Sequence, residues 1–293
     1  MSIFQQLIFN GLIAGGVYAL IALGYTMVYG ILKFINFAHG EVFMVGAYVT
    51  WFLNVVLHLH LVVAIVVSVI ACSVLGFIIE KCAYKPLRGR NTLVFLITAI
   101  AVSFLLQGIV LALFGADIKT FSETIPTTVY TIGGASVTNI QLMIIAASVV
   151  IMVVLHFFIK QTKTGKAIRA MTDNLEVAST IGIDINKTMS AVFIIGSAIA
   201  AIGGSLVAMD QNLTPAMGVS VGIKAFTAAV VGGIGNIYGA MLGGFALGLA
   251  ENIGVWFLPS GFKDAIAFIV LIVVLLLRPR GIMGKKHEED VKL

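Results

Sequence analysis

Runs of about 20 apolar residues recur along the whole chain and limit the folds that it can adopt. A helix of about 20 residues crosses the hydrocarbon core of a bilayer, where every backbone polar group must be satisfied within the protein. Charged residues make up only 11% of the chain, compared with roughly 25% in soluble domains. The sequence therefore predicts an all-α integral membrane protein, a polytopic helical bundle without a soluble domain of ordinary size.

The apolar runs predict about eight transmembrane segments, of which the seventh is broken or re-entrant. The expected segments cover residues 5–32, 41–57, 62–80, 92–113, 140–159, 189–208, 223–257 and 263–278. All five prolines fall between these segments, as expected because a proline inside a helix removes a backbone hydrogen bond. Residues 1–293 are predicted to form a single transmembrane domain. We expect the first segment to remain in the mature protein, because no basic residue precedes Lys33.

Basic residues outside the apolar segments indicate the orientation of the chain. They gather at residues 81–90, in the loop of residues 160–188, and from residue 278 onward. The positive-inside rule places these three regions in the cytoplasm. The loop of residues 115–139 carries only Lys119 against two acidic residues, so we expect it to be external. This orientation predicts an external N-terminus and a cytoplasmic C-terminus.

The external loop contains a candidate β-hairpin. Two β-prone stretches, residues 129–132 and 135–138, flank Gly133 and Gly134, a pair suited to a two-residue turn. A plain surface loop is the alternative.

Residue 210 is expected outside the membrane and residue 278 inside. The eighth segment alone completes this crossing, so the seventh segment must return to the side on which it starts. The glycine-rich stretch of residues 232–236 interrupts this segment. Irregular backbone at membrane depth is tolerated where it is buried in protein or lines a cavity, as a substrate pathway would require. Glycines at four-residue spacing, such as Gly235, Gly239 and Gly243, also permit close helix packing, and both interpretations can hold together.

Six polar residues in or beside the apolar segments are candidates for a translocation pathway. They are Asn36, His39, Glu41, Gln107, Asn236 and Glu251. A charge at the bilayer centre costs about 2.5 to 3.5 kcal/mol on insertion scales, so the two glutamates require a local reason. Each glutamate could instead cap a helix or pair within the bundle, and Gln107 could form an interhelical hydrogen bond.

No sequence pattern indicates catalysis by this chain. Residues 162–167 include Gly165 and Lys166 but lack the upstream glycine and the following Ser or Thr of a phosphate-binding loop. The five histidines show no spacing typical of metal ligands. We therefore expect no catalytic residue, no metal and no cofactor in the chain.

The loop of residues 160–188 is longer than a turn requires and is predicted to contain a short amphipathic helix. Its apolar or small positions recur at three- and four-residue spacings: Ile168, Met171, Leu175, Ala178, Ile181 and Gly182. The face that they form could bind in a groove of a soluble partner. Alternatively, the helix could lie on anionic lipid, helped by its lysines.

Two stretches of the sequence resemble motifs of a transporter family. The stretch from Glu176 to Gly182 is similar to the EAA-xxx-G cytoplasmic loop of ABC importer permeases, with Val177 in place of the first alanine. The stretch from Asn36 to Tyr48 looks like the N-terminal signature of branched-chain amino-acid permeases of the LivH type. The similarity covers essentially the whole chain.

The resemblance implies a transport subunit, not an enzyme, in the cytoplasmic (inner) membrane of a bacterial-type cell. Its expected partners are a second, divergent permease chain, two cytoplasmic ATP-binding subunits, a periplasmic or lipid-anchored binding protein and membrane lipid, but no nucleic acid. Residues Arg169, Glu176, Ala178 and Gly182 would couple the permease to ATP hydrolysis in the partner subunits.

The expected substrates of this importer are leucine, isoleucine and valine. Urea, short amides or other amino acids are the alternatives within the family. An ion-coupled secondary transporter is the alternative outside the family, because Glu41 and Glu251 could lie on an ion path.

Overall fold

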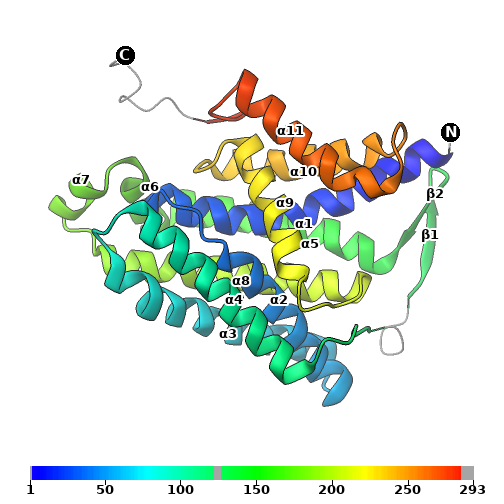
Figure 1. Ribbon diagram of the computed structural model, residues 1–293, viewed down its shortest axis with the longest axis horizontal. Coiled ribbons are helices and arrows are strands. Elements are labelled where there is room, and N and C mark those ends of the chain that lie inside the picture. The colour runs from blue at the N-terminus through cyan, green and yellow to red at the C-terminus, as the bar shows by residue number, and fades with distance from the viewer. Residues whose placement is uncertain (1, 122–126, 285–293) are drawn as a thin grey trace.

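The computed structural model describes residues 2–121 and 127–284, most of which lie in long helices that run roughly along one axis of the molecule (Figure 1). The α-helices are α1 (Ser2–Leu32), α2 (Ala38–Trp51), α3 (Leu61–Ile79), α4 (Thr92–Phe114), α5 (Asn139–Gln161), α6 (Lys163–Asp173), α7 (Leu175–Thr180), α8 (Ile185–Asp210), α9 (Met217–Gly232), α10 (Ile237–Gly254) and α11 (Lys263–Leu277). Short π-helical segments, Phe52–Val56 and Glu80–Tyr84, extend α2 and α3, and two 3-10 turns cover Lys85–Leu87 and Ser260–Phe262.

Helices α1 and α8 form the centre of the bundle. In the most apolar 18-residue window of α8, 78% of the residues are buried, whereas the corresponding value is 22% for α4 and 6% for α11. The outer helices therefore present their apolar side chains to lipid or to another membrane chain. α1 packs closely along α10, where a Cβ at Gly244 would lie 2.5 Å from the backbone nitrogen of Ala19. This contact confirms the close-packing interpretation for part of the glycine pattern.

The expected segments agree with the observed helices to within a few residues, with two differences. α9 begins at Met217, not at 223, because Gly218, Ser220 and Gly222 lower the apolar character of its first turns. The count of eight transmembrane segments is not confirmed. Within the described residues, six helices are long and apolar enough to cross a membrane, or seven spans if the bent pair of α9 and α10 counts as one. α2 is not among them even with its π-helical extension, because His39, Glu41 and Asn54 lower the apolar character of this stretch.

The predicted hairpin and the N-terminus lie at the same end of the molecule. Strands β1 (Val129–Ile132) and β2 (Ala135–Thr138) pair antiparallel with Ile132 opposite Ala135, which confirms the hairpin and its two-glycine turn. The side chain of Gln6 in α1 exchanges hydrogen bonds of 2.8 and 3.0 Å with the backbone of Ser136. A bridge between Lys119 and Leu213 brings the start of α9 to this end as well.

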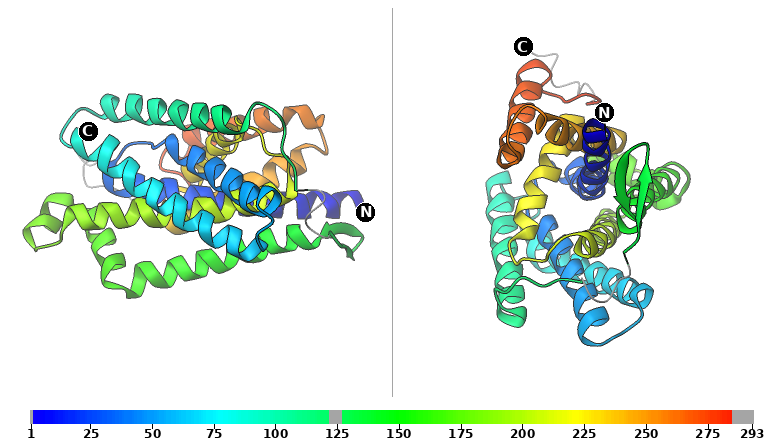
Figure 2. Two further views of the ribbon diagram at one scale, coloured as in Figure 1. Left: turned by 90° about the horizontal axis from the view of Figure 1, so that it is seen from below. Right: turned by 90° about the vertical axis from the view of Figure 1, so that its right-hand side faces the viewer.

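α9 and α10 meet at an angle of 118° and form the expected broken pair. The break lies at the opposite end from the hairpin, where the backbone N–H groups of Ile282 and Met283 donate to the carbonyls of Val231 and Gly232. α10 then returns toward the hairpin end, where Trp256 packs against Phe4 of α1. The structure thus confirms that this stretch is broken, and its return to the side on which it starts stays a prediction. Both Figure 1 and the right view of Figure 2 show α9 lying between α4 and α11.

Candidate functional site

The loop of residues 160–188 contains two helices, so the expectation of one short helix is wrong. Asn174 separates α6 from α7 with extended backbone angles, φ −156° and ψ 115°. Its side-chain oxygen accepts the backbone N–H of Val177 at 3.0 Å and caps α7. Asparagine favours such caps because its short polar side chain competes for backbone hydrogen bonds in a helix interior. The break rotates α7 away from the periodicity that the sequence suggested.

The face predicted for the single helix is divided between the protein interior and the surface. Ile168, Met171 and Ala178 are buried against the bundle, and Ala178 is only 1% exposed. Val177 and Ile181 are instead 55% and 67% exposed. Among the predicted coupling residues, Arg169, Glu176 and Gly182 are exposed, whereas Ala178 faces inward and is unable to contact a partner directly.

Gly182 ends α7 and turns the chain into α8. Its φ of +88° lies in the left-handed region that glycine adopts without strain, and the N–H of the next residue, Ile183, donates to the Ala178 carbonyl at 3.1 Å. Asp184 then caps α8, because its carboxylate accepts the backbone N–H of Lys187 at 3.0 Å. This hydrogen bond holds the pKa of Asp184 below its ordinary value. A short turn, held by these hydrogen bonds, therefore joins α7 to α8.

A cluster of buried polar groups surrounds Glu41 at the contact of α1, α2, α4 and α9. Glu41 is fully buried, and one of its carboxylate oxygens accepts the Ser103 hydroxyl at 3.1 Å. The other carboxylate oxygen, the His39 Nε2 and the Tyr25 hydroxyl have no hydrogen-bond partner among the described residues. The Tyr25 and His39 rings lie edge to face with centroids 5.2 Å apart. An unsatisfied buried polar group costs about 1 to 3 kcal/mol, so three of them in one cluster require an explanation.

Glycines on α9 form the wall opposite Glu41. A Cβ at Gly218 would lie 2.8 Å from the Gly40 carbonyl and would also meet the free Glu41 oxygen. A Cβ at Gly222 would lie 3.1 Å from the Tyr25 hydroxyl. At this glycine seam the backbones of α2 and α9 lie in close contact, and beside it Phe37, which precedes α2, packs edge to face on Phe226 of α9.

Glu251 lies in a second buried site, in which its charge is paired. It accepts the Tyr18 hydroxyl at 2.8 Å, and its other oxygen lies 3.5 Å from the Lys224 ammonium. Lys224 also contacts Asp264 at 2.6 Å. These groups join α1, α9, α10 and α11, and they confirm the pairing alternative for Glu251.

Lys224 was missed by the sequence interpretation, although a signal was present. It is the only basic residue between Lys187 and Lys263, and it lies in an apolar segment, where a cation requires an acidic partner. A third buried acid, Glu80, was also missed; it is paired with Arg88 and accepts the Ser190 hydroxyl at 2.8 Å. Of the three buried glutamates in the described residues, Glu41 is the one without a cationic partner.

The remaining candidate residues occupy other places. Asn36 accepts the Tyr84 hydroxyl at 2.6 Å and anchors the turn between α1 and α2. Gln107 donates to the Pro215 carbonyl at 3.3 Å, which ties α4 to the segment that precedes α9. Asn236 caps α10 by accepting the N–H groups of Tyr238 and Gly239. The six candidates therefore do not form one continuous site.

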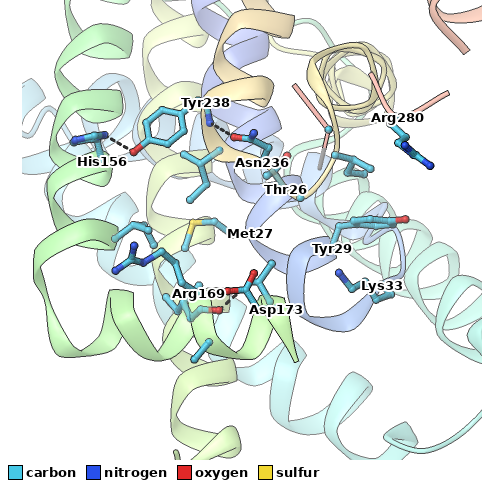
Figure 3. Close-up of a pocket in the computed structure, with 18 of the residues that line it drawn as sticks. Thr26, Met27, Tyr29, Lys33, His156, Arg169, Asp173, Asn236, Tyr238 and Arg280 are labelled. Carbon is cyan, nitrogen blue, oxygen red and sulfur yellow. Dashed lines mark hydrogen bonds between the residues drawn. The ribbon is translucent and has the colours of Figure 1, made fainter. Parts of the chain in front are cut away.

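Asn236 lines a cavity of about 1340 Å³ at the end of the molecule opposite the hairpin. Figure 3 shows its walls: Tyr29 from α1 and Lys33 just after it, His156 from α5, Arg169 and Asp173 from α6, Asn236 and Tyr238 from the start of α10, and Arg280 from the segment after α11. Neither Glu41 nor Glu251 lines this cavity.

Comparisons with known proteins agree on one family. The model of a family described as branched-chain amino acid transport system / permease component matches residues 7–275. The chain is 41% identical to the high-affinity branched-chain amino acid transport system permease protein BraD of Pseudomonas aeruginosa, over 98% of this chain and 97% of BraD. It is 40% identical to LivH of Escherichia coli K12, over 98% of each chain. A probable LivH of Methanocaldococcus jannaschii is 30% identical over 96% of this chain and 93% of that protein.

Proposed function

The chain belongs to the family of branched-chain amino acid transport system permease components, and we propose from this premise that it forms half of the pathway of an ATP-driven importer for leucine, isoleucine and valine. The observation that carries the proposal is the identity of 40% or more to BraD and LivH over nearly the full length of each chain. The chain is a transport subunit, and the reaction that supplies the free energy, ATP hydrolysis, belongs to partner subunits.

The proposed complex contains a second, divergent permease chain, two cytoplasmic ATP-binding subunits and a periplasmic or lipid-anchored binding protein. Its membrane is the inner membrane, with the basic end of the molecule and the C-terminus in the cytoplasm. The apolar side chains exposed on α4 and α11 support a membrane partner on this face. α9 lies between these two helices, and its Val219 is exposed on the same outer face. The hairpin and the loop of residues 115–139, at the opposite end, are the proposed contact for the binding protein.

The proposed coupling surface is the exposed side of α6 and α7, with Arg169, Glu176 and Gly182 at its polar positions and Val177 and Ile181 at its apolar ones. Ala178 supports this surface from inside the protein. A groove on the ATP-binding subunit would enclose the two exposed apolar side chains, and closure of the ATPases would move α7 and, through the turn at Gly182, α8. The different contacts that ATP makes in the two states provide the free energy.

The proposed substrate pathway passes the polar cluster around Glu41. An amino acid carries an ammonium group that the unpaired Glu41 carboxylate could bind, while His39 and Tyr25 offer further polar contacts. The glycine seam between α2 and α9 supports access to this cluster, because glycines carry no side chains that would interlock the two helices there. Glu251 with Lys224, Gln107 and Asn236 would position the helices along the route without holding the substrate.

Transport by the purified complex, reconstituted in vesicles with its binding protein, tests the function. We expect uptake of labelled leucine that requires ATP and is inhibited by excess isoleucine or valine. Inhibition by urea or a short amide, without inhibition by isoleucine, would identify a different substrate class within the family. Uptake that follows an ion gradient without ATP would instead support the secondary transporter.

The substitution Gly182→Arg tests the coupling surface separately. No atom lies within 4 Å of a Cβ at this position, so the long charged side chain would project outward onto the proposed surface. We expect normal insertion in the membrane but loss of binding of the ATPase subunits. Gly182→Asn is the matched control, because asparagine tolerates the left-handed backbone and adds no long charge. Normal assembly and uptake by the arginine variant would contradict the proposal.

A further inference from the structure

The cavity at the basic end has a strong excess of positive charge. Its cationic lining residues come from four parts of the chain: Lys33, Lys160, Lys166, Arg169 and Arg280. Asp173 is the one acidic residue in its lining. Partial burial lowers the pKa of Lys33, and the nearby carboxylate of Asp173 opposes this shift. Like charges gathered in this way repel one another, so an anion in the cavity would relieve the repulsion.

A second observation points to a ligand in the same place. Thr26 is one of the lining residues, and its buried hydroxyl has no hydrogen-bond partner among the described residues. The N-terminus of the 18-residue helix α10 also opens onto the cavity at Asn236, and its partial positive charge favours an anion. Tyr238 and His156, whose side chains are 2.6 Å apart, complete this wall (Figure 3).

The positive charge of the cavity favours some classes of ligand over others. A zwitterionic amino acid, the substrate under the proposed function, would bring an ammonium group that the surrounding cations repel. An anion with more than one negative charge, or with several oxygen acceptors on one centre, fits five cations and a free hydroxyl better. Basic pockets between membrane helices on the cytoplasmic side are known to suit the head groups of anionic lipids.

We propose that this cavity binds a phosphate-bearing anion, with Lys33, Lys160 and Lys166 as its principal charge partners and Thr26 as a hydrogen-bond donor. The bound phosphate would connect α1, α5 and α6 to the break between α9 and α10, and would thereby hold the coupling loop against the broken helix pair. The phosphate group can come from an anionic phospholipid or from a soluble phosphate compound.

Binding to the complete, purified importer tests this proposal without reference to transport. The complex would be stripped of bound lipid, placed in phosphatidylcholine nanodiscs with or without cardiolipin, and analysed by native mass spectrometry for retained cardiolipin. In a second arm, inorganic pyrophosphate would be titrated against the complex in pure phosphatidylcholine by calorimetry. The test variant is Lys33→Gln with Lys160→Gln and Lys166→Gln. The matched control is Lys85→Gln with Arg90→Gln and Lys163→Gln, which removes the same charge from exposed residues outside the lining.

We expect the wild type and the control to bind the phosphate probe and the test variant to bind it about 100-fold more weakly, since each cation near an anionic group strengthens binding roughly fivefold. Thr26→Val, which keeps the shape of the side chain, should weaken binding by a smaller factor. Retained cardiolipin without pyrophosphate binding would identify a lipid head group, and pyrophosphate binding would identify a soluble ligand. Equal binding by the test and control variants, or no binding of either probe to the wild type, would overturn the proposal. Because the experiment measures binding of a phosphate probe and not uptake of leucine, a different transported substrate would leave its result unchanged.

Discussion

Two buried carboxylates in the bundle, Glu41 and Glu251, differ in how the protein satisfies them. Glu251 contacts a lysine and a tyrosine that belong to other helices, and its site joins four helices. Glu41 has one serine donor, a free oxygen and a wall of glycines. The comparison indicates that the paired charges of Glu251 hold four helices together, whereas the charge of Glu41 has no cation beside it and, under the proposed function, is left for the substrate to pair.

Removing the cation at the paired site should have the largest effect on stability. Lys224→Met leaves Glu251 buried without its ion-pair partner, which we expect to lower the free energy of unfolding by about 3 to 5 kcal/mol. Thermal unfolding of the purified complex in detergent would measure this loss. The double variant Lys224→Met with Glu251→Met should recover most of the stability. A double variant as unstable as the single one would show that the pair is not the unit that holds these helices.

Closing the glycine seam should affect transport more than stability. Gly218→Val places methyl groups against the Gly40 carbonyl and Glu41, and overpacking of this kind costs roughly 1 to 3 kcal/mol. We expect leucine uptake to fall about tenfold or more, because α9 would be displaced from α2 or fixed against it. Gly108→Val on α4 is the matched control, since no atom lies within 4 Å of its Cβ position. Unchanged uptake in the Gly218 variant would show that the contact between α2 and α9 is not part of the transport pathway.

The same conservative substitution at both carboxylates tests the comparison directly. Glu41→Gln should leave the unfolding free energy unchanged or raise it by up to about 1 kcal/mol, because it removes a desolvated charge that lacks a cationic partner. Leucine uptake should nevertheless fall about tenfold if the carboxylate binds the substrate ammonium, since a charge-assisted hydrogen bond is worth roughly 1.5 to 3 kcal/mol. Glu251→Gln should lower stability instead. A loss of stability in both variants would contradict the distinction between them.

A third carboxylate, Asp184, lies at the surface in contact with water, where the contacts of a charge have the smallest effect on stability. Its cap of α8 lowers its pKa, so its contribution to stability is complete above the unfolded pKa of about 3.9 and is lost as pH falls through the lower folded pKa. Asp184→Asn keeps an oxygen acceptor for the cap and removes the titration. We expect a small change near neutral pH and a flatter dependence of the unfolding midpoint on pH below about 4. Parallel curves for the variant and the wild type would show that this cap does not contribute.

Local signals account for what the sequence predicted well. Apolar runs and prolines located most helix ends, because a membrane span must bury a continuous apolar stretch and proline interrupts it. The pair Gly133 and Gly134 located the hairpin, and the glycines at 232–235 located the break. The left-handed backbone of Gly233 and Gly235, with φ values of 109° and 92°, explains why glycine is needed there.

Contacts between distant parts of the chain account for what the sequence did not predict. The partners of Glu251 lie in other helices, and Tyr18 is 233 residues away, so no spacing rule identifies them. The basic cavity likewise requires the ends of α1, α5, α6 and α9 to be placed together. The break at Asn174 was a local signal that was overlooked, since asparagine favours the cap of a helix over its interior. Arg169, Glu176 and Gly182 stay predictions for the coupling surface.

The turn at Gly182 and the cap at Asp184 join α7 directly to α8, the helix that runs through the centre of the protein. α8 contains 26 residues and therefore extends about 39 Å, from the basic end to the end that holds the hairpin. It packs against α1, α2 and α3 along this length. Under the proposed coupling, a partner that displaced α7 would move α8 as a lever arm and would change the surface at the end of the molecule that holds the hairpin.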